Sequence, residues 1–137
     1  MNNLFLRIIS IFIFFTSLDD ISAQTKNRSS VSKNEPFFLF FSKFKGDSIF
    51  QQERIINPIS VVVSDDDDGL LEKKMNIKFV SFDKSDWKKD PVINFKRISL
   101  FRMVVILQLE DTGMYISHYF KRIKGKWFLV KIVDSST

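Results

Sequence analysis

The chain has 137 residues, enough for one domain but not comfortably for two, and with 45% hydrophobic residues it can bury a core. It contains no cysteine, which excludes disulfides, thiol catalysis and metal sites built from thiolates. The net charge of +5 is mild and spread along the chain, so it lacks the clustered basic footprint of a nucleic-acid-binding protein.

The first 23 residues follow the order of a secretory signal peptide. Arg7 is the only charge before an apolar run over residues 8–17, and cleavage is expected after Ala23. A membrane-spanning helix needs roughly 20 apolar residues, so this run of about ten predicts no stable membrane anchor. We expect an exported protein, periplasmic or secreted, with a flexible leader over residues 24–34 and a single domain over residues 35–137.

Two helices are predicted at the start of this domain. The phenylalanines of residues 35–45 recur at the spacing of one apolar helical face, and Gly46 is expected to end this helix in a left-handed conformation. Asp47 or Ser48 would cap a second helix, with Gln51 completing a capping box with Ser48. The residues expected to face inward are Phe37, Phe38, Phe40, Phe41, Phe44, Ile49, Phe50 and Ile55.

The middle of the domain predicts two strands and a turn. Residues 59–64 are rich in β-branched side chains and predict a strand, and residues 65–69 predict a turn. The returning strand is expected within residues 70–82. A short helical turn that holds Trp87 would follow it.

The last forty residues predict three antiparallel strands, over residues 99–110, 114–123 and 127–133, joined by two tight turns. One face of the first of these strands is apolar and the other is mixed. The apolar face consists of Phe101, Met103, Val105, Leu107 and Leu109. Such a strand fits a sheet that is packed on helices, and the whole pattern predicts an α+β fold with N-terminal helices on a curved antiparallel sheet.

Several segments together resemble a known family. They are FFLFFSKF at residues 37–44, DSIFQQERI at residues 47–55, EDTGMY at residues 110–115, and YFKRIKGKWFLVKI at residues 119–132, followed by Asp134. From Glu35 to Ser136 the chain resembles small secreted proteins of Bacteroides-group bacteria that are catalogued as a domain of unknown function. The resemblance implies a cone-shaped, nuclear-transport-factor-like or cystatin-like fold and an exported location, and it implies no catalytic residue.

His118 is the only histidine of the chain, and strand alternation puts it on the same face as Ile116 and Phe120. In the fold that the resemblance implies, this face lines a cavity. His118 is then a general base or a ligand contact, or it is a buried histidine with one hydrogen-bond partner. We favour the buried histidine, because a general base needs an orienting partner and the sequence identifies none.

Aromatic residues suggest a cleft for a sugar or an apolar ligand. Core packing explains Trp127 better, because it opens an alternating strand, whereas Tyr115 and Tyr119 fit a cavity and a surface equally well. The ligand-binding candidates are therefore His118, Tyr115, Tyr119 and Trp87.

Two charged clusters are expected to be solvated. The run Asp65–Asp68 fails the calcium-loop pattern, which would need ligands at Ser64 and Met75, and it predicts an acidic turn. The basic cluster near the last turn is expected to discourage edge pairing rather than to bind nucleic acid. It consists of Lys121, Arg122, Lys124, Lys126 and Lys131. No nucleophile elbow, phosphate loop or paired metal-ligand spacing occurs, so no cofactor and no metal are expected.

These observations favour an exported, non-enzymatic domain that binds a small ligand, a glycan or a protein partner through the concave face of its sheet. One alternative is an enzyme that pairs His118 with Glu110, Asp111 or Asp134. The other alternative is a structural module that forms a homodimer through its sheet.

Overall fold

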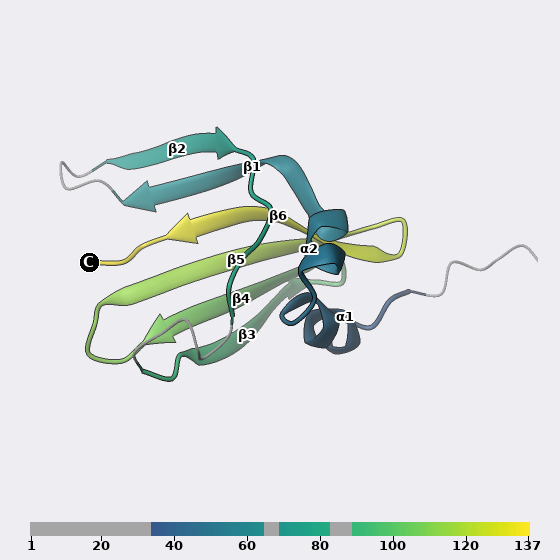
Figure 1. Cartoon of the computed structure of the whole chain (residues 1–137), viewed down its shortest axis with the longest axis horizontal. Helices are drawn as coiled ribbons and strands as arrows, with labels where there is room; N and C mark the ends of the chain where they lie inside the picture. The colour runs from purple at the N-terminus through teal and green to yellow at the C-terminus, as the bar shows by residue number, and fades with distance from the viewer. Residues whose placement is uncertain (1–33, 65–68, 83–88) are drawn as a thin grey trace, which may run out of the picture. The chain divides into compact units, whose positions relative to one another are not determined.

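The computed structural model describes residues 34–64, 69–82 and 89–137, which contain two helices and six strands (Figure 1). The elements are α1 (Phe37–Phe44), α2 (Ser48–Arg54), β1 (Ile55–Ser64), β2 (Leu70–Met75), β3 (Val92–Ser99), β4 (Arg102–Leu109), β5 (Met114–Ile123) and β6 (Lys126–Asp134). The predicted α+β class is confirmed. The predicted signal peptide, the acidic run Asp65–Asp68 and Trp87 lie outside the described residues. Within those ranges, no helix has the length and apolar character that crossing a membrane requires.

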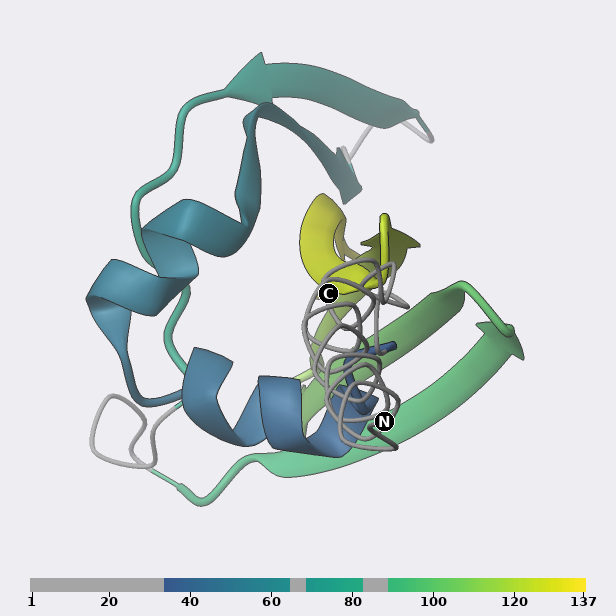
Figure 2. The same cartoon turned by 90° about the vertical axis from the view of Figure 1, so that its right-hand side faces the viewer.

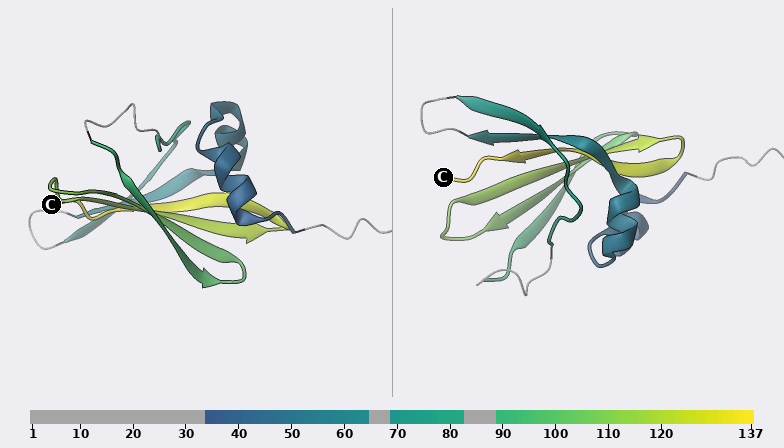
Figure 3. Two further views of the ribbon diagram at one scale, coloured as in Figure 1. Left: turned by 90° about the horizontal axis from the view of Figure 1, so that it is seen from below. Right: turned by 45° about the horizontal axis from the view of Figure 1, so that its top comes forward.

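The strands form one sheet in the order β2-β1-β6-β5-β4-β3. Neighbouring strands are antiparallel with one exception, since β1 and β6 run parallel, with Val61 opposite Ile132. The predicted antiparallel sheet is confirmed except at this parallel pair. β1 and β6 are connected through the rest of the domain rather than by a hairpin, so no local turn sets their relative direction. The sheet bends around the helices, and its helix-covered face is concave (Figures 2 and 3).

The core of the domain is aromatic. The α1 residues Phe37, Phe40, Phe41 and Phe44 are buried against Phe82, Phe120 and Trp127. Their rings meet Phe120 mostly edge to face, an arrangement that the quadrupoles of aromatic rings favour.

Two residues that we expected to face inward point to solvent. Phe38 is 63% exposed and Ile49 is 73% exposed. Each α-helical residue is rotated by about 100° from the one before it, so Phe38 lies off the stripe that Phe37, Phe41 and Phe44 share. The inward orientation of Phe50 and Ile55 is confirmed, since both pack in or against the core.

The ends of the helices depart from the sequence prediction at two points. Asp47, one of the two predicted caps, accepts a hydrogen bond from the backbone N–H of Phe50 at 2.9 Å. The predicted capping box does not form, because Gln51 is fully buried and bonds to the backbone of Val80 instead. Gly46 does not adopt the left-handed conformation that we expected, and α1 ends through a right-handed Lys45.

β3 was not predicted, and β4 begins later than predicted, at Arg102. β3 is an edge strand whose side chains are almost all exposed, so it carries little of the apolar alternation that reveals a strand. Leu100 and Phe101 form the turn between β3 and β4, and Phe101 is 56% exposed, so its assignment to the apolar face is wrong. The other four residues of that face are buried as predicted.

The two tight turns that flank β5 are confirmed. Asp111 and Gly113 have φ angles of 64° and 69° in the first turn, and Lys124 and Gly125 have φ angles of 48° and 81° in the second. A two-residue connection with positive φ at both positions matches the right-handed twist of a hairpin. This turn fixes the register in which Arg122 lies opposite Trp127.

The partly buried carboxylate of Glu35 fastens the beginning of the domain to α2 and to β6. The Glu35 carboxylate accepts hydrogen bonds from both terminal nitrogens of Arg54, at 3.0 and 3.1 Å, and from the backbone N–H of Trp127 at 2.9 Å. The indole N–H of Trp127 donates to the backbone carbonyl of Glu35 at 2.9 Å. Trp127 is only 2% exposed, so its predicted place in the core is confirmed.

Candidate functional site

The predicted site residues on β5 do not lie together. Side chains alternate between the two faces of a strand, so His118 points to the concave face, whereas Tyr115 and Tyr119 point to the other face. Both tyrosines are about one third exposed, at 38% and 36%. Tyr119 lines a separate hollow on its own face, with Arg102 and Lys131. Trp87 lies outside the described residues.

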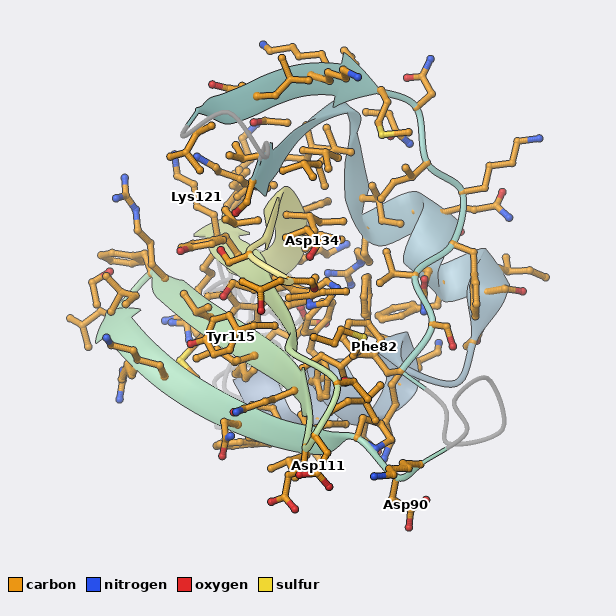
Figure 4. All side chains as sticks on the ribbon, turned by 90° about the vertical axis from the view of Figure 1, so that its left-hand side faces the viewer. Phe82, Asp90, Asp111, Tyr115, Lys121 and Asp134 are labelled. Carbon is orange, nitrogen blue, oxygen red and sulfur yellow. The ribbon has the colours of Figure 1, made fainter. Side chains whose placement is uncertain are left out.

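His118 is buried in the concave face, with only 2% of its surface exposed. Its Nδ1 lies 3.3 Å from the carbonyl oxygen of Val105, and its ring packs at 4.7 Å, centre to centre, against Phe82, which Figure 4 labels. Because a carbonyl can only accept, Nδ1 carries the proton and Nε2 is left as an acceptor. Burial lowers the pKa of His118 to about 4, while the Val105 hydrogen bond and the charge of Asp134 act in the opposite direction. His118 is therefore neutral at pH 7.

The carboxylates proposed as partners of His118 are engaged elsewhere or distant from it in the fold. Asp134 shares a cavity with His118, but its Oδ1 accepts hydrogen bonds from the backbone N–H and the hydroxyl of Ser136. Asp111 lies in the turn between β4 and β5, where it pairs with Lys89, and Glu110 is exposed beside it. Among residues 34–64, 69–82 and 89–137, no hydrogen bond joins His118 to a carboxylate, so the acid–base pair of the enzymatic alternative is not formed there.

A cavity of about 340 Å³ opens on the concave face beside His118. Its floor consists of the sheet residues Val61, Val63, Leu107, Ile116, His118, Ile132 and Asp134. Its other wall consists of Met75, Ile77, Phe79, Val80 and Ser81. Only three of these twelve side chains are polar, namely Ser81, His118 and Asp134, so the cavity is apolar with a few polar groups.

Apart from Met75, the wall opposite the sheet is formed by residues 76–82, a segment without strand partners. This segment crosses the concave face between β2 and the far side of the sheet (Figure 1). Two side-chain amides hold it in place. Asn57 pairs with both the N–H and the C=O of Ile77, at 3.0 and 2.8 Å, and Gln51 pairs in the same way with Val80, at 2.8 and 3.0 Å. These contacts satisfy backbone groups that a sheet would otherwise pair, and they fix the segment across the concave face.

Gln51 and Asn57, which position this segment, were not among the predicted site residues. For Gln51 a signal was present, because it lies three and four residues before Arg54 and Ile55 and shares their inward face. A polar residue on an inward face needs a buried partner. For Asn57 the sequence carries no such signal, since its partner lies 20 residues away in an irregular segment.

The described residues contain no group of three or more His, Asp or Glu side chains that could hold a metal ion. The acidic run that invited a calcium interpretation, Asp65–Asp68, is not among them.

No protein-family model matches the chain, and no curated protein matches it in sequence. The structure is similar to the crystal structure of an NTF2-like protein from Bacteroides fragilis, with 26% sequence identity and a TM-score of 0.56. That match covers 76% of this chain and 48% of the other, so the chain spans about half the length of that protein. A DUF4783 family protein from Bacteroides uniformis is also similar, with 13% identity, a TM-score of 0.42, and coverage of 76% and 98%. The NTF2-like fold that the resemblance implied is therefore confirmed, and so is the likeness to Bacteroides proteins.

Proposed function

We propose that this protein is an exported, non-enzymatic domain that binds a small, mainly apolar ligand in the cavity on the concave face of its sheet. The cavity itself is the observation that carries the proposal. Its volume of about 340 Å³ falls in the range of roughly 300–1,000 Å³ that is typical of small-molecule sites. Apolar walls with a few convergent polar groups are the usual composition of such sites.

The rim of the cavity supports an apolar ligand over a glycan. Val63, Met75 and Phe79 line the cavity and are 40%, 47% and 50% exposed. These side chains leave apolar surface in water that a bound ligand would cover, and burial of such surface favours binding by roughly 25 cal/mol per Å². A glycan would instead need several hydrogen-bonding side chains on the walls.

The polar side chains of the cavity indicate which polar groups a ligand should carry. Neutral His118 offers Nε2 as an acceptor, and Asp134 offers a carboxylate at the edge of the same cavity. A ligand that carries a hydroxyl or an amine is therefore expected to bind more tightly than a hydrocarbon of the same size. Export is supported by the signal-peptide pattern of residues 1–23.

A pair of matched substitutions tests the proposal. Val63 and Val92 are both strand residues, 40% and 41% exposed, but only Val63 lines the cavity. Val63→Trp places an indole in the cavity mouth, whereas Val92→Trp adds the same side chain elsewhere. Fluorescence titration with Nile red, a neutral apolar dye, is expected to give binding that Val63→Trp weakens at least about tenfold and that Val92→Trp leaves unchanged. Equal affinities for the two variants would contradict the proposal.

A further inference from the structure

A second cavity, of about 330 Å³, lies at a different place in the fold and shares no lining residue with the first. It is formed where the start of α1 meets β3 and the hairpin of β5 and β6, and Figure 2 shows α1 lying along β3. Its lining residues are Phe37, Phe38, Phe95, Arg97, Met103, Arg122 and Trp127. The set holds two arginines and no acidic residue, which makes the cavity positively charged.

Arg122 is held against Trp127, and its Nε has no hydrogen-bond acceptor among the described residues. The centre of its guanidinium lies 4.5 Å from the ring centre of Trp127, and its Nε is the one buried side-chain nitrogen or oxygen that lacks a partner among the described residues. Contact with an aromatic ring orients a guanidinium and leaves the N–H donors in its plane available. Buried polar groups in native proteins are normally hydrogen-bonded, so an acceptor for this N–H is expected.

Among the described residues, no acidic side chain pairs with the two arginines of this cavity. Arg97 donates only a long hydrogen bond of 3.4 Å to the backbone carbonyl of Ser99 and forms no ion pair within the described ranges. By contrast, Arg54 is fully paired, since Glu35 binds it through two oxygens. The carboxylate of Glu35 is thereby engaged and does not neutralise Arg97 or Arg122. The start of α1 adds further positive potential, because Pro36 provides no side-chain cap and the first turn contains no acidic residue.

The other walls are aromatic and partly open to solvent. Phe38 and Phe95 are 63% and 41% exposed, and their ring centres lie 5.2 Å apart in an edge-to-face contact. An inorganic anion alone would leave these rings in water. A ligand with an apolar body would cover them while its anionic head meets the guanidiniums.

We propose that this cavity binds an anionic ligand with an apolar body, in which Arg97 and Arg122 hold a phosphate or carboxylate head and Phe38 and Phe95 contact the body. The site is independent of the ligand cavity on the concave face.

Phenyl phosphate is a suitable probe, and NMR of the isotopically labelled protein reports where it binds. We expect saturable shifts of the Trp127 indole N–H and of the Arg122 Nε–H. Arg97→Gln and Arg122→Gln are expected to weaken binding at least about tenfold, since each removes a charge-assisted contact. Arg102→Gln is the matched control, because Arg102 is a strand arginine that does not line this cavity. Inorganic phosphate and benzyl alcohol, which each carry one half of the probe, are expected to bind more weakly than phenyl phosphate.

If Arg122→Gln does not fold, Arg97→Gln still tests the proposal. Arg97 is exposed, so its substitution is expected to leave the fold intact. Equal weakening by Arg102→Gln and Arg97→Gln would mean diffuse attraction by surface charge and would overturn the proposal. Shifts confined to the concave cavity, at Ile116 and Ile132, would overturn it as well, and so would the absence of saturable binding. Sedimentation with phosphatidic acid vesicles then distinguishes two sources of the ligand. If the ligand is a lipid headgroup, the wild-type protein sediments with the vesicles and Arg97→Gln does not. If the ligand is a soluble molecule, both proteins stay in solution.

Discussion

The ion pair between Glu35 and Arg54 makes the sharpest prediction about stability. Glu35→Ala removes three hydrogen bonds, two from Arg54 and one from the backbone N–H of Trp127. The Arg54 side chain is only 11% exposed, so the substitution leaves a nearly buried cation without its counter-charge. Arg54 then keeps only its bond to the carbonyl of Trp127 and its contacts with aromatic rings.

The expected loss follows from these burials. Removing one partner of a fully buried pair costs about 3–5 kcal/mol of the free energy of unfolding. The Glu35 side chain is 23% exposed, so some of this cost is relieved by water, and we expect about 2–4 kcal/mol. Glu35→Gln keeps an acceptor but loses the charge, and about half of that effect is expected.

Urea unfolding followed by tryptophan fluorescence measures this loss. With a slope of about 2 kcal/mol per M, a loss of about 3 kcal/mol lowers the unfolding midpoint by about 1.5 M. The control is the exposed pair of Lys89 and Asp111, whose side chains are 58% and 83% exposed. Asp111→Asn is expected to change stability by less than about 0.5 kcal/mol, and Asn tolerates the positive φ at this position. A midpoint shift for Glu35→Ala no larger than that for Asp111→Asn would refute the reasoning.

Three further predictions concern the histidine, the core and the wall of the cavity. The pKa of His118 falls from 6.5 to about 4 on folding, so the unfolded chain binds more protons than the folded protein between these pH values. The contribution of His118 to stability is therefore complete above pH 6.5, and the free energy of unfolding falls by up to about 3 kcal/mol as the pH drops to 4. Urea unfolding at several pH values is expected to show a weaker pH dependence for His118→Gln than for the wild type. Phe44 is 0% exposed, so Phe44→Ala is expected to lower the free energy of unfolding by about 3–5 kcal/mol, whereas Phe38→Ala should lower it by less than about 1 kcal/mol. Similar losses for the two variants in thermal unfolding would contradict the assignment of the buried helix face. Gln51→Ala is expected to speed hydrogen exchange at the Val80 amide more than at the Ile77 amide, which Asn57 holds, and equal acceleration at both would show that the two anchors do not act separately.

Local periodicity was enough to predict most of the fold. The spacing of the phenylalanines predicted α1, and the turns at residues 111–113 and 124–125 predicted the β4-β5-β6 meander. The same spacing does not separate Phe38 from its neighbours, because a cluster of five phenylalanines obscures where the buried stripe ends. β3 was missed because an exposed edge strand needs no apolar face.

The candidate site was less predictable, because it depends on contacts between distant segments. The inward orientation of His118 follows from strand alternation, whereas its hydrogen bond to the Val105 carbonyl does not. The same alternation separates Tyr115 and Tyr119 from His118, and that consequence could have been read from the sequence. The cavity itself exists because Gln51 and Asn57 hold residues 76–82 across the sheet, and no local pattern encodes those two pairings.

A crystal structure of the protein purified from the cells that produce it tests the ligand-binding proposal most directly. We predict density for a small, mainly apolar molecule in the cavity on the concave face, in contact with Ile116 and Ile132 and with a polar atom near His118 or Asp134. A cavity closed by the side chains of Phe79 and its neighbours, with no room for a ligand, would contradict the account.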